Sequence, residues 1–217
     1  MRFTLNIALT VFTILAAFAA IPAQTKAQEP AVMSLLRKNY SGAGAVTAAF
    51  DLSIYWSVRE REEKKSGELL IAPGDKFKVS LGREIYVCDG KTYWLYSEKN
   101  SQVVIHNFSD IDASTLPSRF LSSFLSGRVF TQKRSEGGTA ELVWSGGAGS
   151  AADDGYTAIT AVVEEKSGTI KTLKLTDENG NVHTYTFKKT AFDKPPKSDV
   201  FRFSAPKGVE VVDMRDK

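Results

Sequence analysis

Residues 50–58 read Phe-Asp-Leu-Ser-Ile-Tyr-Trp-Ser-Val, and this stretch decides the fold. Its apolar residues recur at every second position: Phe50, Leu52, Ile54, Trp56 and Val58. A period of two predicts a β-strand that buries one face and exposes the other. Because a strand of this kind is stable only beside other strands, the rest of the chain has to supply a sheet.

Strand-like segments follow along the whole chain, separated by turn signals. The charged run at residues 59–65 predicts a polar hairpin tip, and Asp89-Gly90 marks the clearest hairpin. The spacing predicts a mainly β protein, a single antiparallel sheet of about 11 strands rolled into a barrel or half-barrel. The strands expected after the first are residues 68–72, 76–81, 84–88, 92–96, 102–106, 129–133, 140–144, 156–164, 169–176, 182–188 and 200–203.

Two short helices interrupt this series, at residues 30–40 and 117–125. An apolar sheet face needs a cover, and these helices are the segments available for it. Two interpretations remain open: the helices complete an ordinary core, or they form a lid over a cavity suited to acyl chains. Their apolar faces consist of Val32, Leu35, Leu36 and Tyr40 in the first helix and of Phe120, Leu121, Phe124 and Leu125 in the second.

The composition is that of a folded globular chain. Of the 217 residues, 42% are hydrophobic and 24% are charged, which excludes an intrinsically disordered class. The net charge of +3 gives no indication of a nucleic-acid partner. The one cysteine, Cys88, excludes an internal disulfide and a cysteine-rich metal site.

The N-terminus has the features of a secretory signal peptide. Arg2 precedes an apolar stretch at residues 5–21, and small residues lead to Ala27. We place cleavage after Ala27, with Ala23 as the alternative, so that residues 1–27 are the signal peptide and residues 28–217 the single mature domain. An uncleaved membrane anchor is the other interpretation. Since Cys88 lies far from the processing site, it cannot carry a lipid anchor there, and the mature protein is expected to be soluble.

Catalytic motifs are absent from the sequence. Its two histidines, His106 and His183, belong to no HExxH or Cys–His spacing, and no GxSxG occurs. The GxGxxA match at residues 147–152 is not followed by a helix pattern, which argues against a nucleotide site. A Ser-His-Asp arrangement of residues remote in sequence keeps a hydrolase as an alternative. We therefore expect a binding protein rather than an enzyme, with no cofactor and no metal.

Several motifs occur in a fixed order along the chain. After Phe50 come Gly67-Glu68-Leu69, then Phe77, then DGKTYWLY at residues 89–96, and finally FRFSAPKGV at residues 201–209. In their order and spacing these motifs resemble the periplasmic lipoprotein carrier family, LolA, over nearly the whole mature chain.

The resemblance implies an unclosed β-barrel with helices across its opening and a hydrophobic cavity that takes the acyl chains of lipoproteins. It implies a monomeric periplasmic chaperone for lipoprotein transport in outer membrane biogenesis. The partners would be acylated lipoproteins, an inner-membrane lipoprotein-releasing ABC transporter and an outer-membrane acceptor lipoprotein. The alternative is a related periplasmic module of the same fold that binds another lipid or glycolipid, or that senses envelope stress.

One position departs from the family pattern. The family commonly has an Arg before the Pro that follows the Gly-acidic-Leu strand, and that Arg helps to hold the lid closed. In this sequence Ala72 precedes Pro73.

We predict the cavity lining from strand alternation, lid position and side-chain size. About half of the candidates are expected to touch the ligand, and the rest to be ordinary core. The candidates are Phe50, Leu52, Ile54, Trp56, Leu69, Ile71, Phe77, Val79, Trp94, Phe120, Leu121 and Phe124.

Overall fold

The computed structural model describes residues 29–111, 128–146 and 155–215. The expected signal peptide and the helix expected at residues 117–125 lie outside these ranges, as do three of the lining candidates, Phe120, Leu121 and Phe124.

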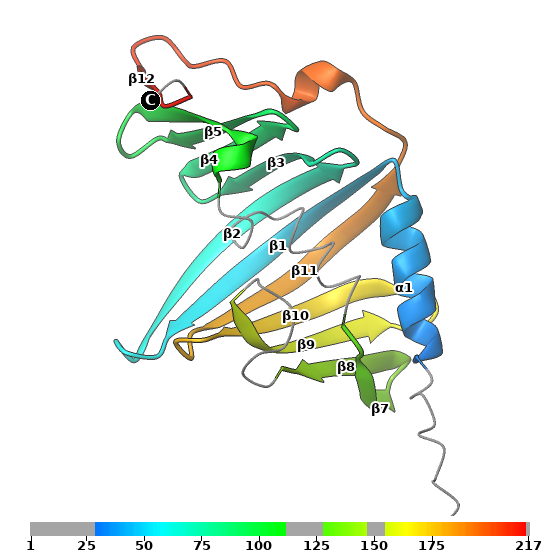
Figure 1. Cartoon of the computed structure of the whole chain (residues 1–217). Coiled ribbons are helices and arrows are strands. Elements are labelled where there is room, and N and C mark those ends of the chain that lie inside the picture. The colour runs from blue at the N-terminus through cyan, green and yellow to red at the C-terminus, as the bar shows by residue number, and fades with distance from the viewer. Residues whose placement is uncertain (1–28, 112–127, 147–154, 216–217) are drawn as a thin grey trace, which may run out of the picture.

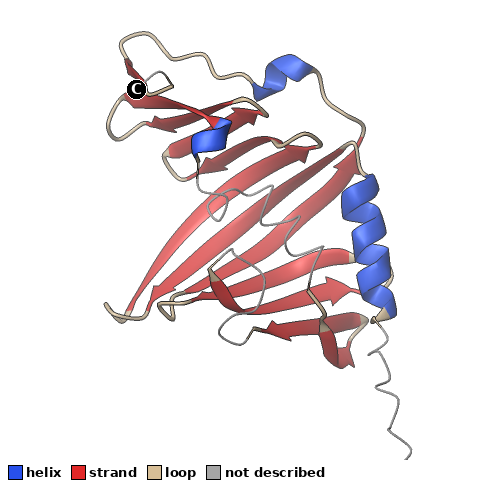
Figure 2. Cartoon of the chain, viewed as in Figure 1, coloured by secondary structure: helices blue, strands red, loops and turns tan. Residues whose placement is uncertain are grey.

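The described residues form one 12-stranded sheet with the strand order β12-β6-β5-β4-β3-β2-β1-β11-β10-β9-β8-β7 (Figure 1). The edge strands β12 and β7 lie at opposite ends of the sheet and do not pair, so the barrel is unclosed (Figure 2). This confirms the predicted mainly β fold. The strands are β1 (Ala45–Trp56), β2 (Arg61–Ala72), β3 (Lys76–Leu81), β4 (Glu84–Asp89), β5 (Thr92–Ser97), β6 (Gln102–Asn107), β7 (Thr131–Glu136), β8 (Thr139–Ser145), β9 (Tyr156–Glu164), β10 (Thr169–Asp177), β11 (Val182–Asp193) and β12 (Glu210–Asp213).

Short helices accompany this sheet. Among the described residues there is one α-helix, α1 (Ala31–Gly42), in agreement with the helix expected at residues 30–40. Two single-turn 3₁₀ helices, η1 (Phe108–Asp110) and η3 (Ser198–Phe201), lie in the connections after β6 and β11.

The predicted hairpin at Asp89-Gly90 joins β4 to β5. The Asp89 carboxylate accepts hydrogen bonds from the backbone N–H groups of Lys91 (2.9 Å) and Thr92 (2.8 Å). Gly90 has a φ of +90°, a conformation that is accessible to glycine at little cost. The turn chemistry of these residues therefore fixes the register of the hairpin.

The hairpin expected after the first strand is present, but the bounds of its polar tip, residues 59–65, are wrong. β2 already begins at Arg61, so the turn is confined to residues 57–60. The charged side chains are held in the ladder because they pair across it: Ser53 Oγ donates to Glu62 (2.6 Å), and Trp56 Nε1 donates to Glu63 (3.4 Å).

The expected strand at residues 200–203 is also wrong. Part of that segment forms η3, and the last strand is β12, which runs parallel to β6. The sheet is therefore antiparallel at every pairing except this one, and it has one strand more than the approximately 11 expected.

The two faces of the sheet differ in character, as β1 shows. Phe50 and Leu52 are each 3% exposed on the face that we call the inner face, whereas Asp51 and Ser53 lie on the other, the outer face. Directly paired residues of neighbouring strands share a face, so the strand register shows which residues of the other strands lie on the inner face. Leu52 pairs with Tyr185 on β11, and Val79 on β3 pairs with Tyr86 on β4.

Helix α1 packs on the inner face at the end formed by β8, β9 and β10. Met33 and Leu36 have no exposed surface there. The Tyr40 hydroxyl accepts a hydrogen bond from the backbone N–H of Ile170 (3.3 Å), and burial raises the pKa of Tyr40 to about 12. Gly168 allows the close approach of the helix, because a Cβ at that position would lie 2.9 Å from Cγ of Leu35.

The segment that connects β11 to β12 contacts the outer face. Phe201 on η3 is 2% exposed and packs with Ala45 and Ala72, and the rings of Tyr96 and Phe203 stack with centroids 5.4 Å apart. This segment covers outer-face apolar residues of the β2–β5 region, and so the two faces have separate cores.

Candidate ligand-binding site on the inner face

The inner face carries two apolar clusters that meet at Tyr185 and Phe187. The first, which we call the helix cluster, consists of Val32, Met33, Leu36, Tyr40, Val46, Phe130, Ala140, Leu142, Ile159, Ala161, Val163, Ile170, Leu173 and Leu175. The second, which we call the central cluster, has as its floor the buried residues Phe50, Leu52, Ile54, Ile71, Phe77, Val79 and Cys88. Nine partly buried residues surround that floor: Trp56, Leu69, Leu81, Tyr86, Tyr93, Phe108, Ile111, Tyr185 and Phe187.

The central cluster brings together eight of the candidates that were predicted from sequence. Most of the floor comes from β1, β2 and β3, whose alternating residues all point to the inner face. Phe77 has no exposed surface. The eight candidates in this cluster are Phe50, Leu52, Ile54, Trp56, Leu69, Ile71, Phe77 and Val79.

Trp94 is placed on the other face, so its assignment to the lining requires correction. Its neighbour Tyr93 pairs with Cys88, which in turn pairs with Phe77 on the inner face. Trp94 pairs instead with Val87, and Val87 pairs with Lys78 on β3. Because Lys78 lies between the inner-face residues Phe77 and Val79, Trp94 points to the outer face. In the sequence both positions are aromatic, and so alternation alone could not decide which of the two points inward.

Sequence reasoning missed several aromatic residues of the site. Tyr185 and Phe187 lie opposite Leu52 and Phe50, and the Phe50 and Tyr185 rings have centroids 5.6 Å apart. The alternation Tyr-Thr-Phe at residues 185–187 was a usable signal for these two. Phe108 and Ile111 reach the cluster from the chain that follows β6, and no periodic pattern marks them.

Polar groups also lie on the inner face. Tyr86 Oη donates a hydrogen bond of 2.7 Å to a carboxylate oxygen of Glu84, two residues away on the same face of β4. Burial, followed by this hydrogen bond, raises the pKa of Tyr86 above its usual range. Burial likewise raises the pKa of Tyr93 to about 12 and that of Tyr185 above its usual range. These hydroxyls are therefore neutral hydrogen-bonding groups in a largely apolar setting.

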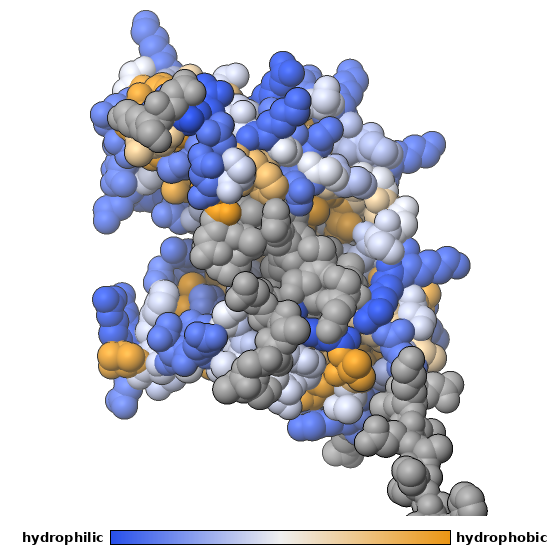
Figure 3. All heavy atoms as spheres, in the orientation of Figure 1, coloured by the Kyte–Doolittle hydropathy of each residue, from blue (hydrophilic) through white to orange (hydrophobic). Residues whose placement is uncertain are grey.

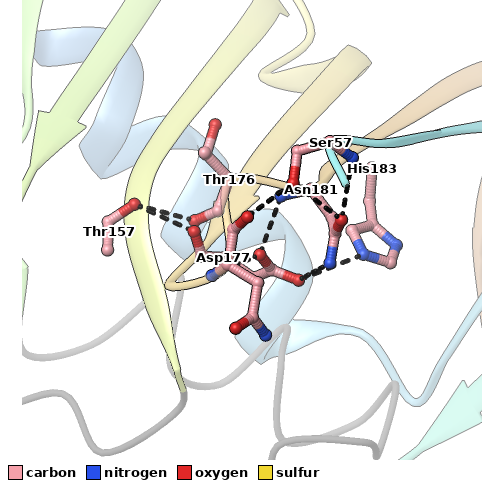
Figure 4. Close-up of polar contacts among 7 residues, drawn as sticks. Ser57, Thr157, Thr176, Asp177, Asn181 and His183 are labelled. Carbon is pink, nitrogen blue, oxygen red and sulfur yellow. Dashed lines mark hydrogen bonds and ion pairs between the residues drawn. The ribbon is translucent and has the colours of Figure 1, made fainter. Parts of the chain in front are cut away.

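The far end of the inner face, where β1 meets β2, is tied to the β10–β11 turn (Figure 4). The backbone N–H of Ser57 donates to Oδ1 of Asn181 (3.0 Å), and Asn181 Nδ2 donates to the Asp177 carboxylate (2.8 Å). His183 Nε2 lies 4.0 Å from the same carboxylate, and its ring centroid lies 6.2 Å from that of Trp56. This network holds two hairpin ends together at the edge of the central cluster.

The surface of the molecule is indented beside this cluster. Figure 3 shows an indentation in the outline between the β3–β5 region and the β1–β2 hairpin, with hydrophobic atoms visible near it and hydrophilic side chains over most of the remaining described surface. Two hollows formed entirely by described residues lie elsewhere. One, of about 440 Å³, has outer-face residues such as Thr47, Leu70 and Val200 in its wall, and the other, of about 510 Å³, is lined largely by hydroxyl and charged groups.

The described residues hold no clustered metal ligands, and their one thiol is buried. They include no group of three or more His, Cys, Asp or Glu residues arranged to hold a metal ion. Burial raises the pKa of the Cys88 thiol to about 11, so the thiolate that a nucleophile requires is scarce at neutral pH. Within the same ranges, no helix is long and apolar enough to span a bilayer.

The family model described as outer membrane lipoprotein carrier protein LolA matches residues 44–204. The chain belongs to this family. An outer-membrane lipoprotein carrier protein from Chromobacterium violaceum is 27% identical over 201 residues, which cover 91% of this chain and 93% of that protein. One from Vibrio campbellii is 26% identical over 194 residues, covering 83% and 85%. A solved structure of an uncharacterized conserved protein from Thermus thermophilus shares the fold, with a TM-score of 0.53 and 16% identity over 84% of this chain and 96% of that one.

In this member of the LolA family, Ala72, which precedes Pro73, faces away from the inner face. Ala72 packs with Phe201 and Ala45 on the outer face. A side chain at position 72 therefore points away from the inner face, whichever residue occupies it.

Proposed function

We propose that this protein is a periplasmic carrier that binds the acyl chains of lipoproteins on the inner face of its sheet. In this proposal it receives the lipoprotein from an inner-membrane ABC transporter and delivers it to an outer-membrane acceptor. Residues 1–27 serve as the cleaved signal peptide, so that the mature domain begins at residue 28.

The observation that carries the proposal is the central cluster in a chain of the LolA family. Its buried floor is surrounded by nine apolar or aromatic residues that keep part of their surface exposed. Each CH₂ group of an acyl chain moved from water onto such a surface contributes about 0.8 kcal/mol, so a long chain is bound firmly without any covalent step. Release then requires a competing apolar surface rather than a reaction.

The decisive experiment measures release of acylated lipoprotein from inner-membrane vesicles that contain the transporter. The mature protein is expected to bring lipoprotein into the soluble fraction in a complex with itself. Failure to release any lipoprotein, together with binding of free glycolipid, would contradict the carrier function and favour the related lipid-binding module.

A matched pair of variants links this activity to the inner face. Leu69 and Leu70 are adjacent, partly buried leucines of β2 on opposite faces of the sheet. Leu69→Gln is expected to reduce the recovered complex severalfold, whereas Leu70→Gln retains it, once both variants are shown to be folded by their thermal unfolding transitions. Equal losses in the two variants would show that the inner face is not the site.

A further inference from the structure

Four of the polar side chains on the inner face lie on β4, β5 and β11, at or beside the central cluster. Tyr86 and Glu84 come from β4, Tyr93 from β5 and Tyr185 from β11. The three tyrosines belong to the partly buried margin of the central cluster, and Glu84 shares the inner face with Tyr86, to which it is hydrogen-bonded. The Tyr93 ring centroid lies 6.1 Å from that of Phe77, and the Tyr185 ring centroid lies 5.6 Å from that of Phe50, so both tyrosines adjoin the same buried floor as Tyr86.

These groups have unused hydrogen-bonding capacity. Among the described residues, no hydrogen-bond partner is present for the hydroxyl of Tyr93 or of Tyr185, although burial raises the pKa of both. Both tyrosines are only partly buried, so each hydroxyl can donate to a ligand in place of water. A hydrogen bond made in a largely apolar setting is stronger than the same bond in water. Two O–H donors are therefore available to a ligand.

Glu84 adds a charge to the same face. Its carboxylate accepts one hydrogen bond from Tyr86, and none of the ion pairs between described residues includes Glu84. Lys65 also lies on the inner face, but its ammonium is paired with Glu63 (3.1 Å). The carboxylate of Glu84 therefore repels a carboxylate or phosphate group, and the repulsion is stronger next to apolar surface than in water. It attracts a donor, because a hydrogen bond to a charged acceptor is among the stronger ones.

Building on the proposed function, we propose that Glu84, Tyr86, Tyr93 and Tyr185 form a polar subsite for the amide group that links an acyl chain to the molecule carrying it. An amide supplies a carbonyl acceptor for the tyrosine hydroxyls and an N–H donor for Glu84. The subsite thereby selects amide-linked acyl groups over free fatty acids and phosphate-bearing lipids, which the apolar floor alone would bind equally well.

The test compares three ligands with similar hydrocarbon chains: N-methyldodecanamide, laurate and dodecyl phosphate. Their affinities for the mature protein are measured by displacement of a fluorescent acyl probe. The amide is expected to bind most tightly. The substitutions Tyr93→Phe and Tyr185→Phe are expected to weaken amide binding by about fivefold each. The two effects are expected to multiply in the double variant. Glu84→Gln is expected to lower the ratio of amide affinity to anion affinity by about tenfold, for laurate and for dodecyl phosphate alike.

Tyr96→Phe is the matched control, since Tyr96 lies on the same strand as Tyr93 but stacks on Phe203 at the outer face. It is expected to leave all three affinities unchanged. Tighter binding of laurate or dodecyl phosphate than of the amide, or identical preferences in the wild type and the inner-face variants, would overturn the subsite while leaving the carrier function intact. Failure of the wild-type protein to bind any of the three ligands would overturn the carrier function and the subsite together.

Discussion

The helix cluster and the central cluster lie on one face of one sheet, yet they differ in how completely they are buried. In the helix cluster, Met33 and Leu36 of α1 close over Leu142 and Ile159, and all four have no exposed surface. In the central cluster the floor is buried, but large residues such as Trp56 and Tyr86 keep part of their surface exposed. Among the described residues, α1 packs on the helix cluster and no α-helix packs on the central cluster, so similar strand patterns are buried to different extents.

The largest expected effect comes from truncating a leucine in each cluster. Leu36→Ala removes a fully buried side chain and should lower the free energy of unfolding by about 2–5 kcal/mol. Leu69→Ala, at the partly exposed margin of the central cluster, should lower it by about 1 kcal/mol. Urea unfolding measures both values. If the two losses are equal, the central cluster is as much a structural core as the helix cluster.

A smaller effect is expected where α1 meets the sheet. Gly168 has a φ of +62°, and a Cβ there would lie 2.9 Å from Leu35 Cγ and 3.0 Å from the backbone nitrogen of Leu36. Gly168→Ala should therefore lower the free energy of unfolding by about 1–3 kcal/mol through backbone strain and displacement of the helix. Gly42→Ala is the control, because a Cβ at Gly42 would meet nothing within 4 Å. Equal stability of the two variants would show that α1 is not tightly seated.

The smallest expected effect is a pH dependence at the margin of the central cluster. Burial lowers the pKa of His183 even though the Asp177 carboxylate acts in the opposite direction. The unfolded chain then binds more protons than the folded one below about pH 6.5, so the stability contributed by neutral His183 is lost as the pH falls through that range. Unfolding experiments between pH 8 and pH 5 should show a weaker decline for His183→Gln than for the wild type. A steeper decline in the variant would mean that Asp177 pairs with a protonated His183.

The sequence predicted the parts of the molecule that are governed by local pattern. Alternation from Phe50 to Trp56 placed the central strand and its buried face correctly, and Asp89-Gly90 located the β4–β5 hairpin. The inner-face residues of β2 and β3 followed from the same period of two. These features depend on neighbours in sequence, which a single chain displays directly.

The parts that were missed depend on contacts that are distant in sequence. Whether Tyr93 or Trp94 faces inward is decided by pairing with Cys88 and Val87, and two adjacent aromatic residues look alike in the sequence. The residues after β11 form η3 rather than a strand. Phe201, the last residue of η3, packs against Ala45 and Ala72, which are far away in the chain. The tyrosine hydroxyls escaped notice because a tyrosine in a strand is usually interpreted as an apolar residue.

The pairing of β1 with β11 has a consequence for the order of folding. Strands β1 to β6 are neighbours both in sequence and in the sheet, and the same holds for β7 to β11. The two series are joined by the ladder between β1 and β11, in which Ala45 pairs with Asp193. Hairpins form quickly, but a ladder between remote segments must first overcome the entropy of closing the long chain between them. During synthesis, each series can assemble as its residues emerge, while the two remain unjoined until residues 182–193 arrive. Until then, β1 has a free edge, and the incomplete chain is at its most vulnerable to proteases and to aggregation.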